Sequence, residues 1–434
     1  MLASISGVQD LRPVVYPGAI HVHSEAEIRE NIEKTVLDKI IEAWTKPAKS
    51  LPAGAGKPKP RKKLDEIICS GTLEEVNEFF HKKNWTDGLP IIPPALEKVE
   101  EYLRYTDLAP DEEIATLPIA NLVATPRNIA VNAVMAGCPP QFTPLLIAAV
   151  EAIAEPEYNL MNIGSTMGQM PWLLVNGPIV KQLGIESGVG LASRGPNPAI
   201  GRAFRLILIN IAGYRPGETA MGSFGYLSPF VFAENDDACD EIGWKPYHVE
   251  QGFSRNASTV TPRVTSIWGF KSENPLGSEA EPLLQLVCDN QVKAIPLEFA
   301  LSYGPHHMST VLLTPPIARV IAQSGYSKRQ VAEYVWENAK VLRRDAIVMP
   351  ARLGVRPTMP DQTHMFKLPE KYDVGPDEMI PLLACASPDV IDVVVCGDPS
   401  RNKIMNLWAI YSRPVTKEIK LPADWEKLLE KSRT

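Results

Sequence analysis

The sequence predicts an α/β protein in which one or more mixed sheets are flanked by helices, preceded by an N-terminal helical arm. The first observation is composition, since 45% hydrophobic and 22% charged residues in a chain of 434 are typical of a globular protein with a large core. The second is that strand-like runs alternate with helical segments after residue 259. The third is one amphipathic helical pattern followed by a Pro/Gly/Lys-rich run near the start of the chain.

We expect three regions along the chain. Residues 1–63 form an arm, in which Ser24 caps a helix over 24–45 and the run over 46–63 is an exposed linker. Residues 64–258 form an α-rich first part of the body, and residues 259–434 form an α/β second part. An amphipathic helix on a tether packs on a neighbouring surface, either its own body or a second subunit, so we predict a homo- or hetero-oligomer through the arm.

The elements of the body follow from apolar spacing and from turn residues. Helices are expected over 72–83 and 95–105, on both sides of Cys138, and over 198–212, 317–324 and 328–341. Strands are expected over 119–124, 171–177, 259–268, 294–301, 310–313 and 390–395. The segment 390–395 is predicted to be a parallel strand that leads into a turn, and α/β sheets usually bind ligands at such strand ends.

Charge and composition exclude several classes of protein. The net charge of −7 argues against nucleic acid or an anionic membrane as the main partner, because both need a basic face. No apolar run is long enough to span a bilayer, and the first residues lack the pattern of a signal peptide, which predicts a cytoplasmic protein. Six cysteines without C-x-x-C pairing are typical of free thiols in a reducing compartment.

Cys138 is the first candidate catalytic residue. It stands between two apolar helical runs and directly before Pro139-Pro140, so we expect it at a helix N-terminus. Unpaired N–H groups and the helix dipole at such a position stabilise a thiolate. The alternative is a small buried residue wedged between helices, because free cysteine is among the most buried residue types.

A glycine-rich segment at 184–213 leads into a helix and carries Arg194, Arg202 and Arg205. Asn197 is expected to cap this helix, and the arginines could donate to the carboxylate or phosphate of a small anionic molecule. The alternative is that the glycines allow close helix packing while the arginines face water. Neither a dinucleotide nor a P-loop spacing is present.

Acidic residues and histidines give weaker signals. A cluster over 234–240 could hold a hard cation, although a solvated acidic loop is commoner; Glu234 ends an apolar run and is expected to be partly buried. His306 and His307 are adjacent, so their rings diverge, while His21 and His23 lie in the arm. No Cys/His grouping supplies four ligands, so no metal site is predicted, and the identity of any cofactor stays open.

Several motifs together resemble a little-characterised family of bacterial proteins that is associated with the UGSC family, some of whose members carry selenocysteine. The motifs are NWTDGLPIIPP at 84–94, AVNAVMAGC ending at Cys138, VNGPI at 175–179, NPAIGRAFRL at 197–206, AEN at 233–235 and GYSKRQVAEYV at 325–335. The resemblance implies thiol or selenol chemistry on small organic compounds, with or without a partner subunit. Two positions depart from it: Gln141 replaces an expected glutamate, and a histidine is missing near Pro316-Ile317.

Two hypotheses follow. In the first, the chain is an enzyme of small-molecule catabolism, with Cys138 as nucleophile or redox thiol and with Glu234 or His306 handling protons. Asn176 would stabilise developing negative charge, and the arginines of the glycine-rich segment would bind an anionic substrate in a lyase, hydrolase or thiol-redox reaction. In the second, the chain is a non-catalytic structural or regulatory subunit of a hetero-oligomeric enzyme.

Overall fold

The computed structural model describes residues 14–18, 23–46, 67–226, 228–266, 270–299, 301, 304–352 and 368–432. Contacts divide the chain into two compact units. One contains residues 1–68 and 119–121, and the other contains residues 69–118 and 122–434. Most of the predicted linker at 46–63, together with His21, lies outside the described residues.

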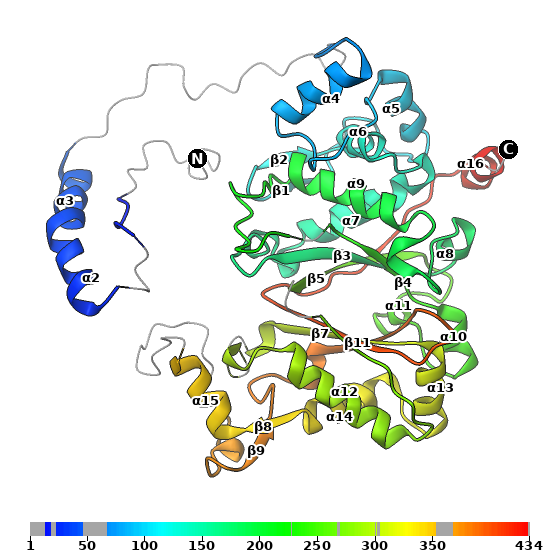
Figure 1. Cartoon of the computed structure of the whole chain (residues 1–434). Coiled ribbons are helices and arrows are strands. Elements are labelled where there is room, and N and C mark those ends of the chain that lie inside the picture. Colours follow the sequence, from blue (N-terminus) through cyan, green and yellow to red (C-terminus); the bar gives the residue numbers. More distant parts are fainter. Residues whose placement is uncertain are drawn as a thin grey trace. The chain divides into compact units, whose positions relative to one another are not determined.

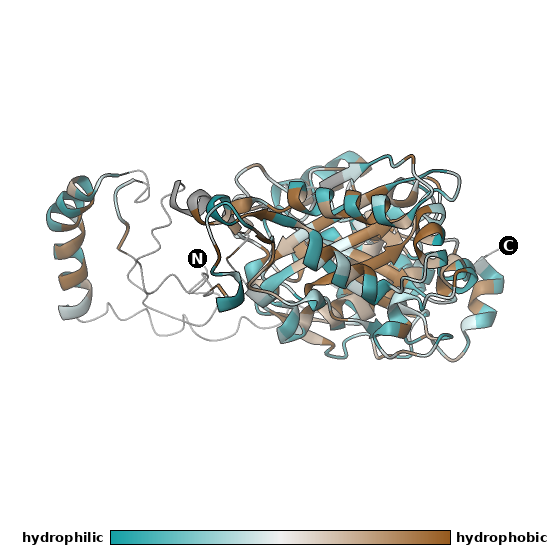
Figure 2. Ribbon diagram, turned by 90° about the horizontal axis from the view of Figure 1, so that it is seen from below, coloured by the Kyte–Doolittle hydropathy of each residue, from teal (hydrophilic) through white to brown (hydrophobic). Residues whose placement is uncertain are grey.

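The predicted helix of the arm is confirmed. α2 (Glu25–Asn31), a π-helical turn (Ile32–Val36) and α3 (Leu37–Thr45) follow one another without a break. Ser24 and Glu27 form a capping box, in which each side chain accepts a hydrogen bond from the backbone N–H of the other. The apolar face of this helix is visible in Figure 2, and within the described structure its exposed apolar side chains include Leu37, Ile41 and Trp44.

The first sheet of the body has four strands in the order β12 (Lys417–Glu418), β5 (Thr259–Ser266), β3 (Gln169–Asn176) and β4 (Val231–Ala233). β3 runs parallel to β4 and antiparallel to β5 along its full length. All eight residues of β3 are buried, as an apolar run bounded by a Gly turn predicts. The expected boundary between the two parts of the body, at 258/259, falls between β4 and β5 of this one sheet.

The second sheet repeats this arrangement with strands in the order β10 (Ile391–Val395), β7 (His307–Leu313), β11 (Ile404–Ile410) and β6 (Phe270–Glu273). β7 runs parallel to β10 and antiparallel to β11, as β3 does with β4 and β5. Each sheet takes one edge strand from the chain segment that follows a strand of the other sheet. β6 follows β5 in the chain but pairs with β11, whereas β12 follows β11 but pairs with β5.

The two sheets face each other and carry helices on their outer sides (Figure 1). α7 (Thr143–Ala154) and α9 (Asn197–Asn210) pack on the first sheet, and α12 (Ala280–Ala294) and α14 (Lys328–Asn338) pack on the second. Inward-facing apolar side chains fill the space between the sheets: Trp172, Leu174, Phe232, Leu312, Val394 and Leu407. The predicted mixed-sheet α/β architecture is therefore present.

The remaining helices and strands complete the body: α4 (Leu73–Lys82), α5 (Leu96–Leu103), β1 (Ala115–Leu117), β2 (Leu122–Ala124), α6 (Pro126–Ala136), α8 (Ile179–Gln182), α10 (Asp236–Glu241), α11 (Tyr247–Glu250), α13 (Pro315–Gln323), β8 (Lys340–Leu342), α15 (Arg343–Arg352), β9 (Met379–Pro381) and α16 (Trp425–Ser432). Capping boxes begin α4, α6 and α14. Among the residues described, no helix is long and apolar enough to cross a membrane.

The expected strand at 294–301 is wrong. α12 continues to Ala294, and a 3₁₀ turn over Leu297–Phe299 follows it. The buried residues of α12 include Leu283, Leu284 and Val287, whose spacing belongs to a helix that packs on a sheet. The buried residues Ile295 and Leu301 that follow α12 belong to the same apolar core as these side chains.

Candidate functional site

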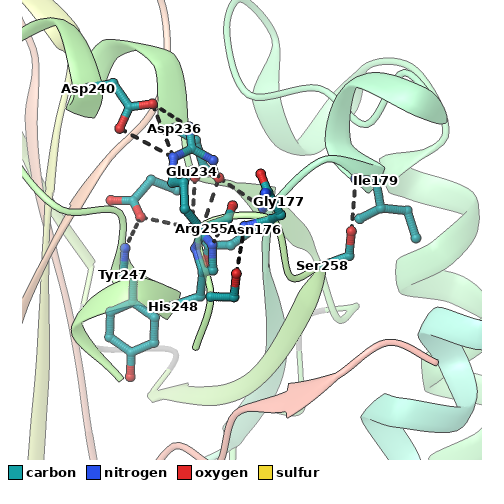
Figure 3. Close-up of polar contacts among 12 residues, drawn as sticks. Asn176, Gly177, Ile179, Glu234, Asp236, Asp240, Tyr247, His248, Arg255 and Ser258 are labelled. Carbon is teal, nitrogen blue, oxygen red and sulfur yellow. Dashed lines mark hydrogen bonds and ion pairs between the residues drawn. The ribbon is translucent and has the colours of Figure 1, made fainter. Parts of the chain in front are cut away.

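A network of charged side chains lies where β4 and β10 end, at the carboxyl ends of the parallel strand pairs of both sheets. Glu234 follows β4 directly, and the Asn235 N–H donates to the carbonyl of Val395 at the end of β10 (2.7 Å). In α/β sheets, ligands usually bind outside the carboxyl ends of parallel strands. Figure 3 shows part of this network.

Glu234 occupies the centre of the network, and its side chain is fully buried. Oε1 accepts from Lys328 Nζ (2.7 Å) and from the Val395 N–H (3.0 Å). Oε2 accepts from Asn176 Nδ2 (2.8 Å) and from the Tyr247 N–H (2.5 Å). Burial favours a raised pKa for Glu234, but Lys328 and the other donors outweigh it and lower that pKa. With four donors on two oxygens, Glu234 holds its charge and is a poor base.

Lys328 is the partner that makes burial of this carboxylate possible. It is the first residue of α14, directly after the N-cap Ser327, and its side chain is almost fully buried. Burial alone lowers the pKa of Lys328, but the negative charge of Glu234 outweighs burial and raises that pKa overall. The ion pair joins the first sheet to a helix of the second.

Glu250 is a partly exposed carboxyl group beside Lys328. It is the last residue of α11, its side chain is 32% exposed, and its Oε2 lies 3.9 Å from Lys328 Nζ. Burial raises the pKa of Glu250 to about 7, and the neighbouring charges of Glu234 and Asp392 act in the same direction. Lys328 opposes this shift only in part, because it is already paired with Glu234 at 2.7 Å.

Asp236 forms the second carboxylate beside Glu234. Oδ1 accepts from Asn176 Nδ2 (3.0 Å), while Oδ2 accepts from the Gly177 N–H (2.9 Å) and from Arg255 Nη1 (3.3 Å). Burial and the charge of Glu234 raise the pKa of Asp236 despite these donors. Arg255 also pairs with Asp240 (Figure 3). Asp240 is exposed, so the network reaches the surface there.

Two of the predicted site residues meet in this network. Asn176, the last residue of β3, donates to Glu234, and Glu234, which was expected to be partly buried, is fully buried. Asn176 binds carboxylates within the protein, so its amide donors are not directed at a substrate oxyanion. The acidic run over 234–240 is not one solvated loop, because it starts with this buried carboxylate and continues as α10.

Of the two environments considered for Cys138, the structure shows the buried one and not a helix N-terminus. α6 ends at Ala136 with Gly137 as its C-cap, a 3₁₀ turn over Pro140–Phe142 follows, and α7 begins only at Thr143. Cys138 is fully buried, and burial raises the pKa of its thiol, so a thiolate is disfavoured. The structure gives it the environment of a packing residue.

The expected anion site is occupied by a carboxylate of the protein itself. Arg202 makes two hydrogen bonds of 3.1 Å to the buried carboxylate of Asp87, and the positive charge of Arg205 also acts on this group. Burial would raise the pKa of Asp87, but Arg202 lowers it overall. Arg194 is exposed and lies 3.7 Å from Glu186. The predicted cap is also wrong, since the Asn197 side chain is buried and donates to the Val231 carbonyl.

His306 lies away from the network. It precedes β7, whereas Glu234 contacts Val395, which pairs with Leu313 at the other end of that strand. About 20 Å of strand therefore separates His306 from Glu234. In the part of the chain that the structure describes, no group of three His, Cys, Asp or Glu side chains could hold a metal ion.

Sequence reasoning missed Lys328, Glu250 and His248. Lys328 carried a usable signal, because a lysine at the first position of a helix opposes the helix dipole and needs a negative partner. Glu250 and His248 lie on the four-residue α11, which shows no apolar periodicity in the sequence. Their roles depend on contacts that only the folded chain creates.

No known protein family matches the sequence, and no curated protein is significantly similar to it. The resemblance to the UGSC-associated family therefore stays a prediction.

Proposed function

We propose that this chain is an enzyme that transfers protons to and from a small molecule, with Glu250 as the group that carries the proton. One observation carries the proposal: the partly exposed Glu250 lies 3.9 Å from Lys328, the buried partner of Glu234, and burial there raises the pKa of Glu250 to about 7. A carboxyl group with a pKa near the working pH serves both as acid and as base.

The neighbours of Glu250 support this division of roles. Glu234 is unsuited to proton transfer because all its acceptor positions are used, whereas Glu250 is partly exposed and reachable. Lys328 supplies a fixed positive charge within 3.9 Å, which stabilises Glu250 once it has lost its proton.

The proposal replaces the expected thiol by a carboxyl group and keeps the expected class of small-molecule lyase or hydrolase, since both reactions move protons. It does not keep an anionic substrate. Arg202 is taken by Asp87, and Lys328, the cation beside Glu250, is paired with Glu234.

A test uses proton exchange, which can be detected whatever the product is. The purified chain is incubated in D₂O with a library of small metabolites, and deuterium incorporation or conversion is followed by mass spectrometry. We expect Glu250→Gln to lower the rate at least about 100-fold, as loss of a general acid or base does. Glu97→Gln, at an exposed position of α5, is the matched control. Equal rates in wild type and Glu250→Gln would refute the proposal.

One observation favours the second candidate, a subunit that acts through its arm. α3 exposes Leu37, Ile41 and Trp44, which is 86% exposed, along one side of the helix. Exposed apolar faces of this kind mark interaction sites. Light scattering would test association through this side of α3. The double variant Ile41→Ser/Trp44→Ser should convert an oligomer to a monomer. A monomeric wild-type chain would refute association of identical copies through the arm.

A further inference from the structure

A groove on the surface of the body follows one face of α7. It consists of two hollows of about 370 and 180 Å³, and Glu151 and Lys420 line both of them, so the hollows adjoin. The α7 residues that line the groove are three or four positions apart and form one face of the helix: Pro144, Ile147, Ala148, Glu151 and Ala154. From Pro144 to Ala154 the helix rises by about 15 Å, which is the length of about five residues of extended chain.

Each wall of the groove contains a strand that lies at the edge of its sheet. Lys417 and Glu418 of β12 line one wall, and Ala115 of β1 lines the other. In the part of the chain that the structure describes, β12 pairs with β5 alone and β1 pairs with β2 alone. The chain after β12 continues along the groove, because Leu421 lines the hollow beside Pro144. The groove therefore runs beside an edge strand and in the direction of that strand.

The backbone of β12 directs hydrogen-bonding groups away from its own sheet. Glu418 lies opposite Thr259 of β5. The next residue, Ile419, donates its N–H to the carbonyl of Ser258 (2.8 Å). In an antiparallel ladder bonded and non-bonded pairs alternate, so the N–H and C=O of Glu418 point outward. Groups of this kind on an edge strand are a template for pairing with another chain.

One end of the groove is mainly apolar. Its lining includes Leu108, Pro144, Ile147, Ala148 and Leu421. The three α7 residues in this set are buried, whereas Leu108 is exposed. An apolar side chain placed against them would be stabilised by burial.

The other end of the groove is charged, with an excess of carboxylates. Four carboxylates and two ammonium groups line the whole groove. Lys417 pairs with Glu155, and Lys420 Nζ lies 3.7 Å from a carboxylate oxygen of Glu151. Both cations therefore already have partners, while Glu418 is an exposed carboxylate at the edge of β12. A ligand with positive charge fits this end best.

We propose that the groove binds an extended peptide segment of another protein, which adds a strand to β12 and carries an apolar residue at one end and basic residues at the other. In this mode of recognition, main-chain hydrogen bonds to the edge strand give affinity, and side-chain pockets give specificity. The side chain of Lys420 is 81% exposed, so a peptide can displace it from Glu151 at little cost. The inference goes beyond the proposed function and does not depend on Glu250.

The experiment selects binders from a display library of random nine-residue peptides on the purified full chain and measures their affinity by fluorescence anisotropy. We expect the selected peptides to combine an apolar residue with lysine or arginine. Methylation of alternate backbone nitrogens should weaken binding at least about 10-fold in one of the two registers, because it removes hydrogen bonds to β12. A library without binders, or binders that tolerate methylation in both registers, would overturn the proposal.

Two substitutions at one residue locate the peptide. Glu418→Pro removes the outward N–H but no donor that faces β5, so it should weaken binding at least about 10-fold. Glu418→Gln keeps this N–H and should weaken binding at most about 3-fold, through loss of one exposed charge. Equal affinities of the two variants would overturn the assignment. If Glu418→Pro does not fold, hydrogen exchange of the Glu418 N–H in the wild type replaces it: the peptide should slow this exchange, and an unchanged rate would overturn the assignment.

Light scattering distinguishes a foreign peptide from a second copy of the chain as the occupant. We expect Glu418→Pro to leave the oligomeric state unchanged. Conversion of an oligomer to a monomer by Glu418→Pro would assign the groove to a second copy and overturn the proposal.

Discussion

Glu234 joins four segments that are distant in the sequence. Its two oxygens accept from β3, from α11, from α14 and from the end of β10. A buried charge is tolerated only when its partners are in place, because desolvation costs several kcal/mol for each ion. The stability of the packing of these four segments around Glu234 therefore depends on Lys328.

Replacement of Lys328 by methionine tests this dependence. It leaves Glu234 buried without its counter-ion, so we expect the free energy of unfolding to fall by about 3–5 kcal/mol in urea titrations. Arg329→Gln, which removes exposed pairs with Glu333 and Asp389, is the control and should cost at most about 1 kcal/mol. The double variant Lys328→Met/Glu234→Gln should be milder than Lys328→Met alone, and a more severe double variant would contradict this account.

The titration of Glu250 predicts a pH dependence of stability. Its pKa rises from 4.5 to about 7 on folding, so the folded chain keeps a proton that the unfolded chain has lost between these values. Stability relative to Glu250→Gln should fall as pH rises from 4.5 to 7 and then level off. Allowing for the partial exposure of Glu250, we expect about 1–2 kcal/mol, measured by urea unfolding at several pH values. If the stability of the wild type relative to Glu250→Gln instead grew with pH, the pKa of Glu250 would be lowered on folding and not raised.

At the scale of helices and strands, much of the fold follows from local pattern. The helices near 24–45 and 72–83 and the strand near 259–266 were predictable because caps and apolar spacing agree with tertiary packing there. The site was predictable only in part. Glu234 ends an apolar run, whereas its pairing with Lys328, 94 residues later in the chain (328 − 234), is set by how the sheets face each other.

The turn after β3 shows how backbone geometry positions a site group. Gly177 has φ +91°, and a Cβ atom there would lie 2.1 Å from the carbonyl oxygen of Ala257. Its N–H donates to Asp236. We expect Gly177→Ala to lower the free energy of unfolding by about 3 kcal/mol, from steric overlap and from backbone strain.

Gly184→Ala is the control for this substitution. Its φ is +63°, but a Cβ atom would meet open space, so about 1 kcal/mol is expected from strain alone. Thermal and urea unfolding of both variants would test the difference, and equal losses would show that the close approach to Ala257 carries no cost.

At the scale of the whole molecule, the exchange of β6 and β12 makes each sheet depend on the other. The segment after β11 returns to the first sheet, where β12 pairs with β5 and α16 packs Trp425, Leu428 and Leu429 on Tyr105. The second sheet, in turn, takes its edge strand from the segment after β5. The first sheet needs β12, which follows β11 of the second sheet in the chain, and the second sheet needs β6, which follows β5 of the first.

Truncation after Arg413 tests this dependence, with truncation after Ser432 as control. Loss of the apolar burial of α16 should lower the free energy of unfolding by about 5 kcal/mol. Hydrogen exchange should accelerate in β5 of the first sheet and in α5. Acceleration confined to β11, the neighbour in sequence, would contradict the role of the exchanged strand.

The exchanged strand also sets an order of events during synthesis. β12 begins 151 residues after β5 ends (417 − 266), so the ribosome makes the whole second sheet before the first one can close. Until then β5 presents an open edge, which is the kind of surface that pairs with other chains. Contacts this distant in sequence are slow to form. We therefore expect refolding of the body to be slow and concentration-sensitive, with assistance from chaperones most needed in the interval before β12 appears.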